Sequence, residues 1–188
     1  MRTQIVSYRM QMLKHIRTFV AALLLAHVAS PAAADQLNMI INGKSFHMGS
    51  DYRWNEDNFG MGFEYDFANR SQWIKSGIVN GFRDSLDNMS YMAGAGLRRR
   101  FFETERMAGL YFDAGLVAFL MSRQDVNDKQ PFPGILPVIT LGNRHVGLNL
   151  SYVPKMAVHE FAHADEIDPN IKGVFFLQAK IALGHRRR

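Results

Sequence analysis

The residue types with the most explicit chemical meaning in this 188-residue chain are the histidines and the glutamate of His159-Glu160-Phe161-Ala162-His163. This is an H-E-x-x-H sequence, in which two His side chains one helical turn apart can bind Zn²⁺ while the Glu acts as general base. A helix over residues 157–167 would place both His side chains on one face. The motif therefore raises the possibility of a zinc hydrolase.

A zinc hydrolase needs more than these residues. It requires a third ligand, a substrate-binding edge and a supporting helical domain, and the nearby additional ligands are Asp165, Glu166 and Asp168. We therefore favour a solvated charged loop over residues 154–172. Two alternatives stay open: a zinc hydrolase with His159 and His163 as ligands and Glu160 as base, and an adventitious metal site on an external loop.

The rest of the chain consists mainly of short apolar or alternating segments separated by Gly, Asn and Asp. The clearest runs from Phe59 to Phe67, where Phe, Met and Tyr alternate with two Gly, Glu64 and Asp66. This period of two predicts a strand with one apolar face and one small or polar face. We expect eight such strands, at about 37–46, 58–67, 72–82, 91–102, 109–121, 137–142, 146–153 and 173–183.

The expected connections alternate in length. An even number of strands joined by long loops at one end and short turns at the other is typical of an antiparallel up-and-down outer-membrane β-barrel. The sequence therefore predicts an all-β fold with long external loops and short periplasmic turns, although composition alone also allows a soluble lipocalin-like barrel. The long connections fall at about 47–57, 83–90, 122–136 and 154–172, and the short ones at 68–71, 103–108 and 143–145.

Two local features bear on this barrel. Pro133 and Pro137 crowd the segment before residue 142, and Pro removes a hydrogen-bond donor, so we expect the weakest strand pairing there. The run Arg98-Arg99-Arg100 falls where a strand should meet the periplasmic interface, and we expect these side chains to extend toward water.

Residues 1–34 have the pattern of a signal peptide. A basic stretch ends at Arg17, the apolar run 19–28 follows, and Ala32-Ala33-Ala34 offers an A-x-A cleavage site. The apolar core is shorter than the roughly 20 residues that a transmembrane helix needs, although an N-terminal anchor is the alternative. We predict export, with residues 35–188 forming the barrel domain.

The charge of the chain gives no support for a nucleic-acid partner. The formal net charge is +5, but residues 1–34 hold four of the 22 Lys and Arg and no acidic residue. The remainder is close to neutral, with 18 basic against 17 acidic residues. The chain has no Cys, so the fold cannot depend on disulfides.

The topology brings distant residues together. If the N-terminus is periplasmic, the first, third, fifth and seventh strands run outward. His47 then follows the first strand and the stretch Arg83-Asp84-Ser85 follows the third, so both lie on the external rim together with the loop 154–172.

Several segments, in their order and spacing, resemble the outer-membrane lipid A palmitoyltransferase family. The resemblance runs from about residue 45 to 154 and rests on Phe46-His47, Trp54–Phe63, Gly81–Ser85, Met92–Gly96, Pro133–Val138 and Leu148–Pro154. It implies an eight-stranded barrel that moves a palmitoyl chain from a phospholipid to a hydroxyl of lipid A without a cofactor. It also implies an essential His, Asp and Ser on the rim, which here are His47, Asp84 and Ser85.

The same resemblance implies that the acyl chain lies inside the barrel. A Gly that faces the lumen helps to set the accepted chain length in the family, and Gly96 is the matching position, with Gly94 assigned beside it to substrate binding. The implied partners are a phospholipid donor and a lipid A acceptor in the outer membrane. We expect a monomer.

The chemistry of the three rim residues agrees with acyl transfer. His47, with a reference pKa near 6.5, is suited to act as base toward the attacking hydroxyl. Asp84 could orient the imidazole, and Ser85 could be nucleophile or oxyanion donor. Neighbouring side chains on a regular strand point to opposite faces, so we favour Ser85 as the group that polarises the carbonyl. A non-catalytic lipid-binding or transport-like barrel is the alternative, and an inward Glu64 or Asp66 would favour it.

Overall fold

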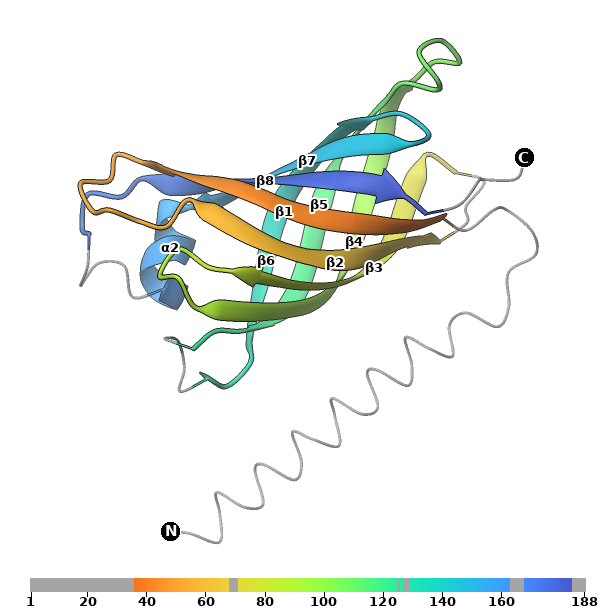
Figure 1. Cartoon of the computed structure of the whole chain (residues 1–188). Helices are drawn as coiled ribbons and strands as arrows, with labels where there is room; N and C mark the ends of the chain where they lie inside the picture. The colour runs from red at the N-terminus through yellow and green to blue at the C-terminus, as the bar shows by residue number, and fades with distance from the viewer. Residues whose placement is uncertain (1–35, 68–70, 125, 127–128, 163–167, 184–188) are drawn as a thin grey trace, which may run out of the picture. The chain divides into compact units, whose positions relative to one another are not determined.

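A computed structural model of the chain describes residues 36–67, 71–124, 126, 129–162 and 168–183. Eight antiparallel strands form a closed barrel in which each strand pairs with its neighbours in the sequence, and the first pairs with the last (Figure 1). The all-β up-and-down prediction is therefore confirmed. The strands are β1 (Gln36–Met48), β2 (Asp57–Phe67), β3 (Trp73–Arg83), β4 (Met89–Glu103), β5 (Tyr111–Ser122), β6 (Phe132–Gly142), β7 (Val146–Pro154) and β8 (Gly173–Ala182).

The alternation expected in β2 is confirmed. Phe59, Met61 and Phe63 are exposed on the outer surface, whereas Glu64 is only 3 % exposed and faces the lumen. This arrangement follows from the strand geometry, because successive side chains point to opposite faces of the sheet. The outside of the barrel is accordingly rich in exposed apolar side chains, among them Val79, Tyr91, Leu97, Leu116, Ile135, Ile139 and Leu148.

The sixth strand is longer than expected. β6 begins at Phe132 rather than at residue 137, and Pro133 and Pro137 both lie within it. The two prolines are paired with Leu120 and Leu116 of β5, while the pairing of β6 with β7 starts only at Val138. The expectation of weak pairing at this seam is thus confirmed on the β7 side, because Pro cannot donate a backbone hydrogen bond there.

The connections divide between two ends of the barrel. One end, here called the rim, carries the connections 49–56, 84–88 and 123–131 and the segment that joins β7 to β8 (Figure 1). The connection 84–88 is a tight turn, shorter than the long loop expected over 83–90. Helix α2 (Lys155–Ala162) follows β7 directly, so the solvated charged loop expected over 154–172 is wrong for residues 155–162. Val158 of this helix and Ile171 after it are buried, because both pack at the rim. None of the described helices is long and apolar enough to cross a membrane, and the predicted signal peptide at 1–34 lies outside the described residues.

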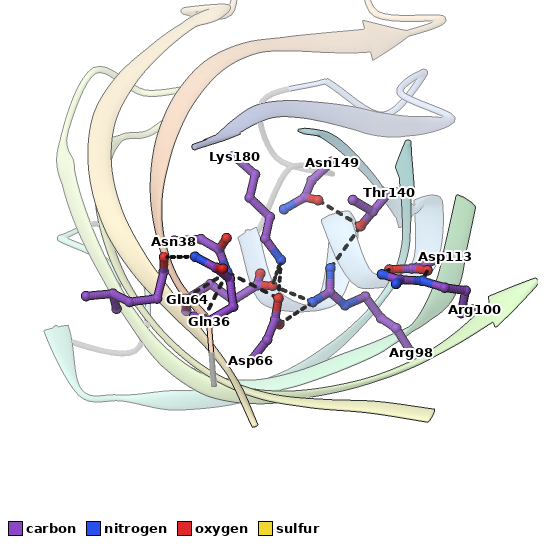
Figure 2. Close-up of polar contacts among 11 residues, drawn as sticks. Gln36, Asn38, Glu64, Asp66, Arg98, Arg100, Asp113, Thr140, Asn149 and Lys180 are labelled. Atoms are coloured by element: carbon purple, nitrogen blue, oxygen red, sulfur yellow. Dashed lines mark hydrogen bonds and ion pairs between the residues drawn. The ribbon is translucent and has the colours of Figure 1, made fainter. Parts of the chain in front are cut away.

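The end of the lumen opposite the rim contains a cluster of charged side chains, here called the ionic cluster (Figure 2). The guanidinium of Arg98 donates to Glu64 at 2.5 Å and to Asp66 at 2.6 Å, and the ammonium of Lys180 donates to the same two carboxylates at 2.5 and 2.7 Å. Arg98 also donates to Thr140 at 3.0 Å. The interpretation of Arg98 as a residue extending to the interface is therefore wrong, since it is 2 % exposed and points inward from β4.

Candidate active site

His47 reaches the lumen because β1 contains a bulge. Asn38, Ile40 and Asn42 are buried inside the barrel, and the pairing with both β2 and β8 then shifts register after Asn42. A bulge inserts one extra residue and changes which face the following side chains occupy. Because of this shift, His47 lines the interior, and its side chain is only 3 % exposed.

The imidazole of His47 and the hydroxyl of Ser85 form a hydrogen-bonded pair at the rim. Nε2 of His47 lies 3.0 Å from Oγ of Ser85, although the residues come from β1 and from the turn after β3. The prediction that the topology brings these two positions together is confirmed. A base within hydrogen-bond distance of a hydroxyl is the geometry required for proton transfer or for activation of an alcohol.

The carboxylate beside His47 belongs to Glu56 rather than to Asp84. Oε1 of Glu56 lies 3.5 Å from Nδ1 of His47 and accepts a hydrogen bond from the backbone N–H of His47 at 3.3 Å. Within the described part of the chain, Nδ1 makes no shorter polar contact. A carboxylate on the Nδ1 side favours the tautomer protonated there, which leaves the lone pair of Nε2 directed at Ser85.

Asp84 instead shapes the turn that carries Ser85. Its Oδ1 accepts from the backbone N–H groups of Leu86 and Asn88 at 2.9 and 3.1 Å, and its Oδ2 accepts from Oγ of Ser90 at 2.8 Å. Nε of Arg123 lies 3.5 Å from the same Oδ2. The geometry therefore does not fulfil the expectation that Asp84 orients the imidazole, because a side chain that closes its own turn is directed away from the neighbouring strand end.

A cavity of about 200 Å³ begins beside the pair and extends into the barrel. His47, Trp54 and Ser85 border it at the rim, and Glu64 and Arg98 border it deeper in the lumen. The wall between is mostly apolar on the side formed by β3 to β6. These wall residues are Ile78, Phe82, Met92, Val117, Phe119, Met121, Phe132, Leu136 and Val138.

Comparison with known proteins identifies the family. Residues 28–161 match the family model for the antimicrobial peptide resistance and lipid A acylation protein PagP. The chain belongs to this family. Over 99 residues it is 33 % identical to the lipid A acyltransferase PagP of Methylobacillus flagellatus, a match that covers 53 % of this chain and 52 % of that protein.

Other similarities are more limited in extent. The lipid A acyltransferase PagP of Bordetella pertussis is 35 % identical over 75 residues, which cover 39 % of this chain and 38 % of that protein. The match thus spans about half of one curated relative and less of the other. Among solved structures, neisserial surface protein A aligns with a TM-score of 0.39 and 12 % identity over 81 % of this chain and 98 % of that chain. Ail of Yersinia pestis aligns with a TM-score of 0.37 and 15 % identity over 81 % and 100 %.

The two glycines assigned to substrate binding occupy different environments in this family member. A Cβ on Gly94 would lie 2.4 Å from the carbonyl oxygen of Ala118, so this position is closed by the backbone of β5. A Cβ on Gly96 would meet Oγ of Ser76 at 2.5 Å and would lie 3.6 and 3.8 Å from Val117 and Ile78, two residues of the cavity wall. Neither glycine itself lines the cavity, but a side chain at Gly96 would project toward its wall.

The H-E-x-x-H motif is only partly visible. His159 lies on α2, and its Nε2 is 3.5 Å from the carbonyl oxygen of Ile171. The side chain of Glu160 and the whole of His163 lie outside the described residues, as do Asp165 and Glu166. No group of three His, Asp or Glu side chains suited to a metal ion occurs among the residues that the structure describes, so the zinc alternative stays untested.

Sequence reasoning missed two parts of the site. Glu56 and Trp54 both lie in the Trp54–Phe63 segment, but no spacing pattern connects them with His47. The indole of Trp54 stacks on the imidazole of His47, with ring centroids 5.0 Å apart and planes 10° apart. The inward Glu64 and Asp66 that would favour a non-catalytic barrel are both present, but they are paired with Arg98 and Lys180. These cationic partners follow only from the closure of the barrel.

Proposed function

We propose that this chain is an outer-membrane acyltransferase that moves a fatty acyl chain from a phospholipid to a hydroxyl of lipid A. The observation that carries the proposal is the His47–Ser85 pair at the mouth of an apolar cavity inside a closed barrel. The family membership supports the substrate class. The outer surface, with its exposed Phe, Leu, Ile and Val side chains, suits a lipid environment better than water.

The cavity suits the acyl chain of a donor phospholipid. Its wall from β3 to β6 offers Ile, Val, Leu, Met and Phe side chains, which favour a hydrocarbon over water. A chain that enters tail-first from the rim would leave its ester group beside His47 and Ser85. The donor therefore binds with the reacting carbonyl where the base and the hydroxyl lie, which supplies proximity and orientation.

The proposed reaction is a direct transfer. The hydroxyl oxygen of the acceptor attacks the carbonyl carbon of the donor ester while Nε2 of His47 removes the hydroxyl proton. Ser85 donates a hydrogen bond to the carbonyl oxygen as negative charge develops there. The bond between the carbonyl carbon and the glycerol oxygen then breaks, and the leaving lysophospholipid takes the proton from His47.

Two carboxylates and one glycine have distinct supporting roles in this proposal. Glu56 stabilises the imidazolium of His47 from the Nδ1 side, at 3.5 Å. Asp84 holds the turn in which Ser85 is presented, through its bonds to Leu86, Asn88 and Ser90. Gly96 helps to set the accepted chain length, because any side chain at this position would project toward Val117 and Ile78 of the cavity wall.

Mass spectrometry of lipid A tests the function. Lipid A from cells that express the chain should carry one additional acyl chain that is absent from cells without it. Purified protein in detergent should give the same product from a defined phospholipid and lipid A. A parent protein that folds as a barrel but transfers no acyl chain to lipid A would exclude the enzyme and favour a lipid-binding barrel of the same fold.

A second measurement separates the two roles considered for Ser85. Incubation of the purified protein with phospholipid alone, followed by intact-protein mass spectrometry, should show no acylated protein, because Ser85 only polarises the carbonyl. Accumulation of a protein with one acyl chain on Ser85 would show instead that Ser85 is the nucleophile.

A further inference from the structure

We infer that Asp168 is a positioning residue for His47, and that it acts through Ser50 and Trp54; this inference rests on the proposed role of His47 as the base. Asp168 precedes β8 and lies far from His47 in the sequence. It approaches the site because the segment 168–172 packs against the connection 49–56 at the rim.

The first link is the carboxylate of Asp168. Its Oδ2 accepts a short hydrogen bond from the hydroxyl of Ser50, and also accepts from the backbone N–H groups of Asp51 and Tyr52 at 3.1 and 3.4 Å. Its Oδ1 accepts from the backbone N–H of Asn170 at 3.1 Å. The hydrogen bond from Ser50 lowers the pKa of Asp168 below its usual value, with the backbone donors acting in the same direction.

The second link joins Ser50 to the indole of Trp54. Nε1 of Trp54 donates to Oγ of Ser50 at 2.7 Å, so the Ser50 hydroxyl accepts from the indole while it donates to Asp168. The edge of Tyr52 packs on the same indole, with ring centroids 4.7 Å apart. These contacts fix the plane of the indole, because the N–H direction of a planar ring determines its rotation.

The third link is the stack of Trp54 on His47, nearly parallel at 10°. A stacked indole limits rotation of the imidazole about χ2, which is the rotation that would move Nε2 away from Ser85. Val158 and Ile171 are buried and also pack against Trp54. Asp168 therefore controls the direction of Nε2 although it does not contact the imidazole.

Trp54 provides its own spectroscopic reporter. The chain contains two Trp, and Trp73 begins β3 at the opposite end of the barrel. In a Trp73→Phe background, emission comes from Trp54 alone. A stacked imidazole quenches indole emission, so the His47→Ala substitution should brighten Trp54 as long as the stack is present.

The test combines emission with kinetics in the full-length protein. Asp168→Ala and Ser50→Ala should increase the acrylamide quenching constant of Trp54 by at least about twofold, because the indole becomes mobile. In both variants the further substitution His47→Ala should no longer brighten Trp54, which is the non-additivity expected of coupled residues. Ser50→Thr keeps the hydroxyl and should behave like the parent.

The kinetic expectation separates positioning from general stability. Asp168→Ala should lower kcat by about 10–10²-fold with KM changed by less than about twofold, because the donor cavity is intact and the base is misdirected. Asp57→Ala is the matched control: it removes a carboxylate at the same rim whose partner is Lys44 on the outer surface at 2.7 Å. This control should leave both emission and kcat unchanged.

The outcomes are distinguishable. A parent-like acrylamide quenching constant of Trp54 in Asp168→Ala would overturn the inference. An equal change of this constant in Asp57→Ala would overturn it as well. Altered emission with unchanged kcat would also overturn it, since the stack would then have no effect on the base. A parent that transfers no acyl chain would overturn the proposed function, while the emission measurements would still decide whether Asp168 holds Trp54 on His47.

Discussion

The two ends of the lumen of this barrel use polar residues in opposite ways. At the rim, His47 and Ser85 make one hydrogen bond to each other, and an apolar cavity lies directly below them. At the other end, Arg98 and Lys180 each contact both Glu64 and Asp66, and four charges are fully engaged with one another. The ionic cluster is almost fully buried apart from the partly exposed Asp66, whereas at the rim Ser85 is half-buried and lies beside the cavity.

This difference shows how a small barrel can combine a fixed end with an end that has space for a ligand. Buried charges are tolerated only when they are paired, and paired charges hold the strands that carry them in a fixed relation. Glu64 and Asp66 belong to β2, Arg98 to β4 and Lys180 to β8, so the ionic cluster joins strands on opposite sides of the lumen (Figure 2). The rim end can then remain open for a ligand without loss of the barrel.

The largest expected effect is on catalysis at the rim. We expect His47→Ala and Ser85→Ala each to lower acyl transfer by about 10²–10⁴-fold, the usual cost of removing a general base or an oxyanion donor. Both variants should keep the heat-modifiable mobility of a folded barrel on gels. In the parent, transfer should rise with pH through the pKa of His47, because only the neutral imidazole accepts a proton. Near-parent activity in both variants would contradict the proposed site.

The second expected effect is on stability at the opposite end. Arg98→Leu leaves the buried Glu64 and the partly buried Asp66 with one ammonium, and we expect a loss of about 3–5 kcal/mol in the free energy of unfolding. Urea unfolding of the folded barrel in lipid vesicles measures it. The neighbouring Arg99→Leu is the matched control, because Arg99 is exposed and contacts Phe101 and Gln72 on the outer surface. Equal losses in the two variants would show that the ionic cluster does not fix this end.

A third prediction concerns the boundary between the two ends. Gly96→Met should shorten the accepted acyl chain, since its side chain would project toward Val117 and Ile78 on the cavity wall. Oγ of Ser76 must move to make room, and this hydroxyl has no hydrogen-bond partner within the described structure. Gly94→Ala serves as a contrast, because its Cβ meets backbone and should disturb the pairing of β4 with β5. Product analysis with donors of different chain length measures the change; an unchanged chain-length profile would show that Gly96 does not limit the cavity.

The smallest expected effect is a pH dependence of the contact between the segment 168–172 and the connection 49–56. The pKa of Asp168 is lowered in the folded protein, so its contribution is fully present above the ordinary Asp pKa of about 4 and is lost as pH falls through the lowered value. Emission of Trp54 in the Trp73→Phe/His47→Ala background, where no imidazole titrates against the indole, should therefore stay constant from neutral pH to about pH 5 and change only below about pH 4. Asp168→Asn should remove that acidic transition; its persistence would assign the transition to another carboxyl group.

Much of the fold could be predicted from the sequence because strand periodicity is a local property. Eight segments were recognised, and seven of them lie close to their observed bounds. The exception is β6, whose first half was missed because Pro133 and Pro137 usually exclude a central strand. Here the two prolines are tolerated because they pair only with β5. The edge of β6 that faces β7 is unpaired before Val138, so no backbone donor is needed there.

The candidate site was predicted in part. The order of the strands sufficed to bring His47 and Ser85 to one rim, and the resemblance supplied their role. The carboxylate beside the imidazole could not be deduced, because Glu56 and Asp84 are both acidic residues near strand ends. The difference lies in hydrogen bonding: Asp84 closes its own turn, whereas Glu56 accepts from the backbone of His47.

The sequence by itself determined that this chain forms an antiparallel barrel and that the candidate site residues lie at one rim, because strand alternation and strand order can be read from consecutive residues. Only the tertiary structure decided that His47 faces inward: the inward residues of β1 are Asn38, Ile40 and Asn42, and a strict alternation would have placed His47 on the outside. The bulge after Asn42 reverses the faces. A bulge depends on how two strands pair across the sheet, so it exists only once β2 and β8 are in place.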